Sequence, residues 1–213
     1  MQPPHWDVIG IGESSIDEVV RLPGVLAPNV KLPIRSRQIR YGGQVATTLA
    51  TCATFGLRAA LLGTMGNDDD VHGLCKTLND RGVDTSLLVQ RAVRHRRATV
   101  LVSEPTGDRT VLWERDARLA LTPGEIPRET IEAARLLHVD DVDVEASIVA
   151  ARIACNAGIP VTSDIDQVSD RTRELIASVT VPIFAEHIPR TLTGEADPER
   201  ALRVLRKTHS GLL

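Results

Sequence analysis

Apolar runs alternate with amphipathic segments along most of this chain, and the alternation predicts its architecture. Four runs rich in apolar and β-branched residues have the character of buried strands: residues 7–12, 59–62, 136–139 and 159–163. Six segments place apolar residues at helical spacing: 44–55, 70–80, 127–135, 145–157, 169–178 and 198–207. A further strand is expected near residues 183–185. This order predicts a three-layer α/β fold, in which helices cover a mostly parallel sheet.

Two pairs of extended segments interrupt the alternation. The first pair covers residues 16–22 and 32–41, separated by Pro-Gly and Pro-Asn turns, and the second covers residues 98–103 and 109–113. The Glu-Pro-Thr-Gly-Asp sequence between the members of the second pair predicts a β-hairpin. We therefore expect a single domain over residues 1–213, with strand excursions at about 16–41 and 97–114.

Composition narrows the class of protein. With 42% hydrophobic and 25% charged residues the chain is an ordinary globular protein, and no apolar run is long enough to span a bilayer. The first residues lack the pattern of a secretory signal, so a cytoplasmic location is expected. A net charge of −3 and an aromatic content of 2% argue against binding to nucleic acid. The basic run 91–97 is interpreted as a solvated loop and the start of a strand.

Two features point to a small-molecule site. Asp17 follows the first predicted strand, on the side where open α/β sheets bind ligands, and a carboxylate there can accept hydrogen bonds from two sugar hydroxyls. Gly42-Gly43 stands where an extended segment becomes a helix, so backbone can approach a ligand closely. Each feature alone also fits a plain turn. Together they predict a site, because both should lie at one edge of the sheet.

Other chemistries receive less support. The pattern Gly10-Ile11-Gly12 suggests a dinucleotide-binding turn, but the third glycine of that motif would fall at Ser15. The acidic clusters Asp140, Asp141, Asp143 and Asp164, Asp166 could bind a hard cation, although helix caps and loop carboxylates explain them more simply. No nucleophile-elbow sequence supports hydrolysis by a serine. We predict no metal site from these residues.

Three motifs make the chain resemble the ribokinase-like, or PfkB, carbohydrate kinases over essentially its whole length. They are Gly10-Ile11-Gly12 leading to Asp17, Gly42-Gly43 opening a helix, and the segment 63–68 with the Arg-Gly-Val-Asp sequence at 81–84. The resemblance implies that the strand excursions form a β-lid over a sugar. It also implies that Asp17 binds sugar hydroxyls and that Gly42 and Gly43 line the same pocket.

The resemblance extends to cofactors and partners. It implies ATP and Mg²⁺ as cofactors of the complete enzyme and a sugar or nucleoside as substrate. The free edges of the lid strands also favour a homodimer formed through the lid. Thr47 stands where the family often has an asparagine, which leaves sugar preference open. The Asn-x-x-Glu motif would fall near residues 185–188, where neither its Asn nor its Glu is present. Glu186 is expected to substitute in part, and Glu186 and Asp164 are assigned to the nucleotide and magnesium side.

One family segment has no counterpart. The sequence contains nothing similar to Asp-Thr-x-Gly-Ala-Gly-Asp, which in the family supplies the anion hole and the catalytic base. We therefore expect no catalytic base among these residues, and we expect it beyond Leu213. On this interpretation the chain is the N-terminal, sugar-binding portion of an ATP-dependent sugar kinase and is inactive alone. The alternative is a non-catalytic relative that binds a sugar or nucleoside, or that dimerises.

Overall fold

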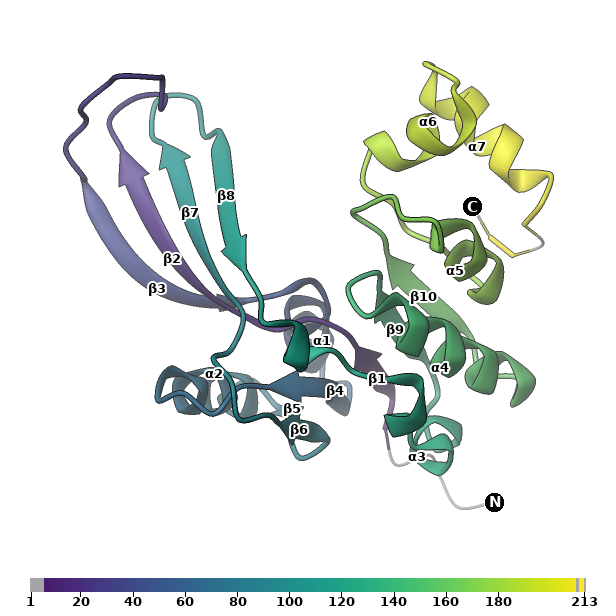
Figure 1. Ribbon diagram of the computed structural model, residues 1–213. Helices are drawn as coiled ribbons and strands as arrows, with labels where there is room; N and C mark the ends of the chain where they lie inside the picture. Colours follow the sequence, from purple (N-terminus) through teal and green to yellow (C-terminus); the bar gives the residue numbers. More distant parts are fainter. Residues whose placement is uncertain (1–5, 210, 213) are drawn as a thin grey trace.

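The computed structural model describes residues 6–209 and 211–212. Its main sheet is wholly parallel and has the strand order β10-β9-β1-β4-β5, with β6 also paired to β4 (Figure 1). The strands are β1 (Val8–Ile11), β4 (Ala59–Met65), β5 (Val83–Asp84), β6 (Leu88–Gln90), β9 (Leu137–Asp140) and β10 (Val161–Asp164). Parallel strands need crossover connections, which the helices provide.

Helices cover both faces of this sheet. They are α1 (Gln44–Thr54), α2 (Asp70–Asp80), α3 (Arg128–Glu132), α4 (Val144–Asn156), α5 (Thr172–Ser178), α6 (His187–Thr193) and α7 (Pro198–Arg206). Buried side chains of α1 and α2 belong to one apolar cluster, and those of α3, α4 and α5 belong to another. The expected three-layer α/β fold is thereby confirmed.

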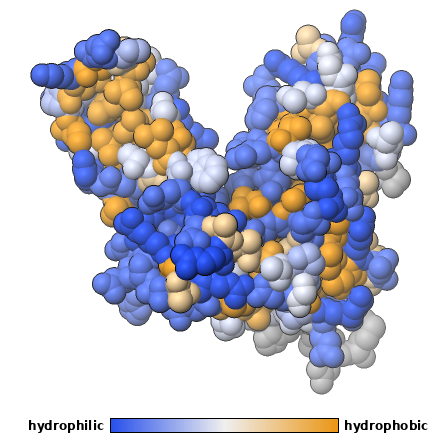
Figure 2. Space-filling view, viewed as in Figure 1, coloured by the Kyte–Doolittle hydropathy of each residue, from blue (hydrophilic) through white to orange (hydrophobic). Residues whose placement is uncertain are grey.

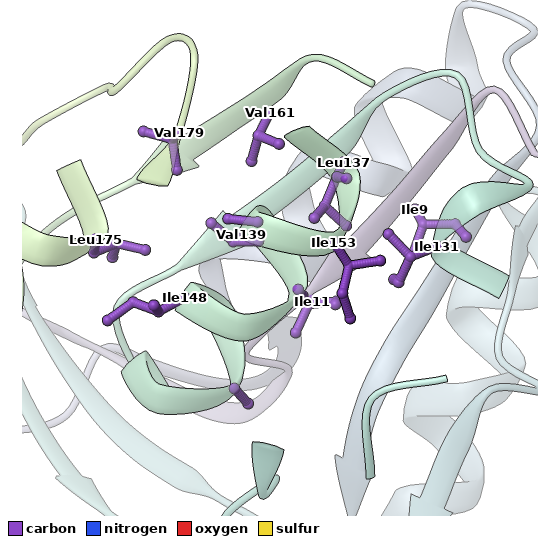
Figure 3. Packing of buried hydrophobic residues seen from close by; sticks show 14 of the residues in the cluster. Ile9, Ile11, Ile131, Leu137, Val139, Ile148, Ile153, Val161, Leu175 and Val179 are labelled. Carbon is purple, nitrogen blue, oxygen red and sulfur yellow. The ribbon is translucent and has the colours of Figure 1, made fainter. Parts of the chain in front are cut away.

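Strand β1 connects the two apolar clusters, because successive side chains of a strand point to opposite faces. Val8 belongs to the cluster of α1 and α2, whereas Ile9 and Ile11 belong to the other cluster, in which Figure 3 shows Ile9 beside Ile131. Gly10 faces α1 so closely that an added Cβ would stand 2.8 Å from Leu49 Cδ1. The first strand therefore needs glycine at this position to let the helix pack.

The strand excursions form a second sheet, which we call the lid. Its strands are β2 (Ser15–Leu22), β3 (Ser36–Gly42), β7 (Arg97–Ser103) and β8 (Arg109–Glu114), in the order β3-β2-β7-β8. Two antiparallel pairs, β2 with β3 and β7 with β8, are joined by parallel pairing of β2 with β7. In Figure 1 the lid rises beside the main sheet as a separate arm.

Several local expectations differ from the structure. Instead of a strand at 183–185, single parallel bridges join Val181 to Thr162 and Phe184 to Ile165, because the segment meets β10 only at intervals. The helix expected at 127–135 is limited to residues 128–132, and the helix expected at 169–178 begins at Thr172. Strands β5 and β6 and helix α6 were not predicted, since they are too short to show periodicity.

Candidate functional site

A cleft of about 780 Å³ lies between the lid and the carboxyl-terminal ends of the main-sheet strands. Its walls come from β2, β7 and β8, from the start of α1, and from the loops after β9 and β10. Figure 2 shows the molecule hollowed between the lid and the helical part that carries α6 and α7. A smaller hollow of about 460 Å³ on the other face of the lid includes neither Asp17 nor the glycine pair. The larger cleft therefore holds the candidate site.

Asp17 lies on β2 at the base of the lid and lines this cleft. Its oxygen Oδ1 is buried and accepts no hydrogen bond from any residue that the structure describes. A buried carboxylate oxygen without a donor is costly, so such atoms in native proteins call for a partner. A ligand hydroxyl placed in the cleft is the kind of donor that would satisfy it.

The glycine pair stands directly against Asp17 and the preceding loop. An added Cβ on Gly42 would lie 2.6 Å from Oδ2 of Asp17, so any larger residue would displace the carboxylate. Gly43 has φ of +99°, and an added Cβ there would collide with the backbone of Glu13 and Ser14. The structure thus brings Asp17, Gly42 and Gly43 together, as we expected from their common sheet edge.

Thr47 lies on the first turns of α1 and also lines the cleft, with its side chain exposed. Helix α1 begins after Gly43. Its first turn is fixed to the preceding loop, because the Ala46 N–H donates a hydrogen bond to the Glu13 carbonyl at 3.2 Å. The Thr47 hydroxyl makes no hydrogen bond that the structure records for the described residues. It is thus free to donate to, or accept from, a bound ligand.

Of the two residues assigned to the nucleotide side, Asp164 lines the cleft and Glu186 does not. Asp164, at the end of β10, lines the cleft together with Asp166. Burial raises the pKa of Asp164, and the charge of Asp166 adds to the shift, against a hydrogen bond from Gln44. Glu186 lies outside the cleft lining, where it pairs with Arg190 one helical turn on, at 2.6 Å.

Glu13 and Arg96 form a buried ion pair at the base of the cleft, and sequence reasoning missed both residues. Their side chains are 8% and 16% exposed, and the Arg96 guanidinium stands 5.5 Å above the ring of Trp113. Burial raises the pKa of Glu13 to about 7, although the charge of Arg96 opposes the shift. Arg96 belongs to the basic run 91–97. The interpretation of this run as solvated is wrong for Arg96, whose side chain is largely buried.

The carboxylates after β9 serve the loops around the cleft. Asp140 is fully buried and accepts backbone hydrogen bonds from Glu13 at 2.6 Å and Val142 at 3.1 Å. Asp141 accepts hydrogen bonds from the backbone N–H groups of residues 166 and 167, at 3.0 and 2.7 Å. Asp143 pairs with Arg115 at 2.8 Å. These partners match the interpretation of the acidic cluster as loop carboxylates.

Residues 6–209 and 211–212 contain no group of three or more His, Cys, Asp or Glu side chains placed to hold a metal ion. Over the same residues, every helix is too short or too polar to cross a bilayer.

The profile of the pfkB family carbohydrate kinases matches residues 7–212. The bifunctional ribokinase/ribose-5-phosphate isomerase A of Fructilactobacillus sanfranciscensis is 22% identical, over 88% of this chain and 35% of that protein. The ATP-dependent ribose-1-phosphate kinase of Halopiger xanaduensis is 26% identical, over 74% of this chain and 53% of that protein.

A solved structure shows the same fold. The ribokinase of Arabidopsis thaliana, complexed with ribose and ATP, superposes with a TM-score of 0.76 at 18% identity. The match covers 98% of this chain and 70% of the ribokinase. The chain therefore spans about half the length, or less, of the two curated relatives and a larger share of the ribokinase.

Proposed function

This chain belongs to the pfkB family of carbohydrate kinases, and we propose that it is the sugar-recognising part of an ATP-dependent kinase that phosphorylates a sugar hydroxyl. The proposed ligand, a sugar or a nucleoside, lies in the cleft between the lid and the main sheet. A cytoplasmic location belongs to the same proposal.

One observation supports this ligand more than any other, namely the buried Oδ1 of Asp17. Asp17 lines the cleft, with one carboxylate oxygen against Gly42 and the other without a donor among the described residues. Neighbouring hydroxyls of a sugar can donate to such a group, and hydrogen bonds to a charged acceptor are stronger than those to neutral ones. Thr47 adds a hydroxyl on the facing helix.

ATP and Mg²⁺ enter the proposal through the family. Mg²⁺ in such enzymes needs few protein carboxylates, because water and phosphate oxygens supply the remaining ligands. Among the residues proposed for this side, Asp164 and its neighbour Asp166 face the cleft, whereas Glu186 does not line it. The sequence has no segment similar to the family's anion hole and base. We therefore propose that these residues hold the sugar and perform phosphoryl transfer poorly by themselves.

The test separates binding from turnover. Calorimetric titration with D-ribose, D-fructose and adenosine, each with and without ATP and Mg²⁺, measures whether the cleft takes a sugar. Coupled measurement of ADP release then measures phosphorylation. Binding of a sugar or nucleoside with little ADP release is expected, and absence of binding across the whole panel would contradict the proposal.

A second candidate is a non-catalytic relative that dimerises through its lid. Large apolar side chains of the lid are exposed to solvent, as Figure 2 shows for this arm, among them Ile39 at 52%, Leu112 at 56% and Trp113 at 55%. Exposed apolar patches and free strand edges are typical of association sites. In this reading the chain binds a sugar or nucleoside without transferring phosphate.

A further inference from the structure

We infer that the ligand of the cleft is an anionic sugar, whose carboxylate or phosphate is bound by Arg109 of the lid. The inference rests on the proposed function, because it names the class of sugar that the same cleft takes. It is carried by the pattern of charges on the face of the lid that looks into the cleft.

Strand register places Arg109 on the same face of the lid as Asp17. Asp17 pairs with Ala98, and Ala98 pairs with Trp113, so these three side chains share one face. Val102 lies four residues beyond Ala98 on β7, and every second residue of a strand returns to the same face, so Val102 shares the face of Ala98. Val102 pairs with Arg109, which therefore lies on that face too. The lining of the cleft agrees, since it includes Asp17, Trp113 and Arg109.

Arg109 differs from the other arginines of the cleft in having no carboxylate partner among the described residues. Arg96 pairs with Glu13, and Arg115 pairs with Asp143. Arginines at or near the opposite face of the lid are also paired: Arg37 with Glu18, Arg94 with Glu114, and Arg97 with Asp68 and Asp70. Among the arginines that line the cleft, Arg109 is thus the one whose guanidinium has no carboxylate partner in the described residues, whereas Arg21 and Arg40, which also lack one, lie outside the cleft lining.

The surface between Asp17 and Arg109 is apolar. Val100 and Val111 pair with each other and lie in the cleft lining, one row beyond Ala98 and Trp113. Four residues of an extended strand cover about 14 Å, and a long arginine side chain can bridge roughly half of that distance. A ligand that meets both groups needs hydroxyls at one end, a carbon skeleton in the middle and an anionic group at the other end.

Arginine suits carboxylates and phosphates because its planar guanidinium donates two parallel hydrogen bonds to their oxygens. Both groups present the same chemistry to Arg109, so sugar acids and sugar phosphates are two sources of one anion. A neutral sugar would satisfy Asp17 and leave the guanidinium to water. The expected preference is therefore for the charged member of a matched pair of sugars.

The experiment uses matched ligands and matched variants of the whole chain. Glucose is titrated beside gluconate and glucose 6-phosphate, and ribose beside ribose 5-phosphate, with inorganic phosphate alone as a further probe. The variants are Arg109→Ala, Arg109→Lys and the control Arg21→Ala. Arg21 pairs with Val102 in the same row of the lid and lies outside the cleft lining.

At least one charged sugar is expected to bind about tenfold more tightly than its neutral partner, a difference of ~1.4 kcal/mol. Arg109→Ala should abolish that difference, Arg109→Lys should restore part of it, and Arg21→Ala should leave it unchanged. If only gluconate, or only glucose 6-phosphate, binds more tightly than glucose, the result identifies the anionic group as a carboxylate or as a phosphate. Circular dichroism confirms that each variant is folded.

Three results would overturn the inference. Neutral sugars could bind as tightly as charged ones, Arg109→Ala could leave the preference intact, or inorganic phosphate alone could bind as tightly as the charged sugar. Each of these leaves the proposed function standing if a sugar binds in an Asp17-dependent manner. Absence of binding by every sugar would contradict the proposed function itself.

Discussion

Asp17 and Gly42 are in such close contact that a Cβ on Gly42 would stand 2.6 Å from the carboxylate oxygen Oδ2. Their pairing is fixed by the register of the lid, in which Ser15 is opposite Gly42 and Asp17 is opposite Arg40. The glycine thus determines where the Asp17 carboxylate lies in the cleft. This contact explains why the two residues should act as one unit in ligand binding.

Gly42→Ala is expected to weaken sugar binding at least about tenfold, because the added methyl group pushes the Asp17 carboxylate from its place. The fold should survive, since the clash involves one side chain. Calorimetric titration with the sugar that binds most tightly measures the effect. The matched control is Gly24→Ala, where an added Cβ meets nothing within 4 Å. Equal losses in both variants would show that the contact with Asp17 is irrelevant.

Burial lowers the pKa of His138 to about 4, which makes folding depend on pH. The unfolded chain binds a proton at this histidine below about pH 6.5, while the folded chain keeps the ring neutral down to about pH 4. Its stabilising contribution is therefore present above pH 6.5 and lost as the pH falls toward 4, by up to about 3 kcal/mol.

Comparison with His138→Gln isolates this contribution, because glutamine does not titrate. Urea unfolding at pH 7 and pH 5 should show the parent chain losing more stability than the variant. Equal losses in the two chains would indicate that His138 titrates normally in the folded state. The ring should also remain neutral at pH 5 in an NMR titration.

Glu13 has the opposite dependence on pH. Burial raises its pKa to about 7, so between about pH 4.5 and 7 the folded chain binds more protons here than the unfolded chain. Its contribution to stability is present at low pH and lost as the pH rises through 7. Glu13→Gln should therefore lose less stability than the parent chain between pH 5 and pH 8 in urea unfolding. A parent chain and variant with parallel curves would contradict the assignment.

The apolar face of the lid should make the chain associate. Ile39 and Leu112 both line the hollow on this face and are half exposed. In light scattering at tens of micromolar protein, the parent chain is expected to have an average molar mass above that of a monomer. The double variant Ile39→Lys with Leu112→Lys is expected to have a mass closer to that of the monomer. Phe55→Lys is the control, since Phe55 is 81% exposed at the end of α1. A monomeric parent chain would exclude association through the lid.

Sequence alone could place Asp17, Gly42 and Gly43, because glycines at the end of an extended segment and a carboxylate beyond the first strand are local signals. It could not find Glu13 and Arg96, which are 83 positions apart and meet only through the parallel pairing of β2 with β7. Periodicity identifies strands but says little about which distant strands pair. The arrangement of charges in the cleft follows from that pairing.

Short elements account for most of the remaining differences. Strands β5 and β6 have two and three residues, too few for alternation to show. The apolar run at 183–185 suggested a strand, but the chain touches β10 only at single bridges before α6 begins. Helix α6 carries a proline at residue 189, within its first turn, where a helix tolerates proline. In a sequence, a proline at this place argues against a helix, so α6 was not predicted.

Titration of the Asp17→Asn variant tests the central claim most directly, because asparagine keeps the size of the side chain and removes its charge. The sugar from the panel that binds the parent chain most tightly is titrated into both proteins by calorimetry. The account predicts binding about 10- to 100-fold weaker in the variant, as expected for hydrogen bonds to a charged acceptor, with unfolding temperature unchanged or raised. Equal affinity in the two folded proteins would contradict the claim that Asp17 binds the sugar.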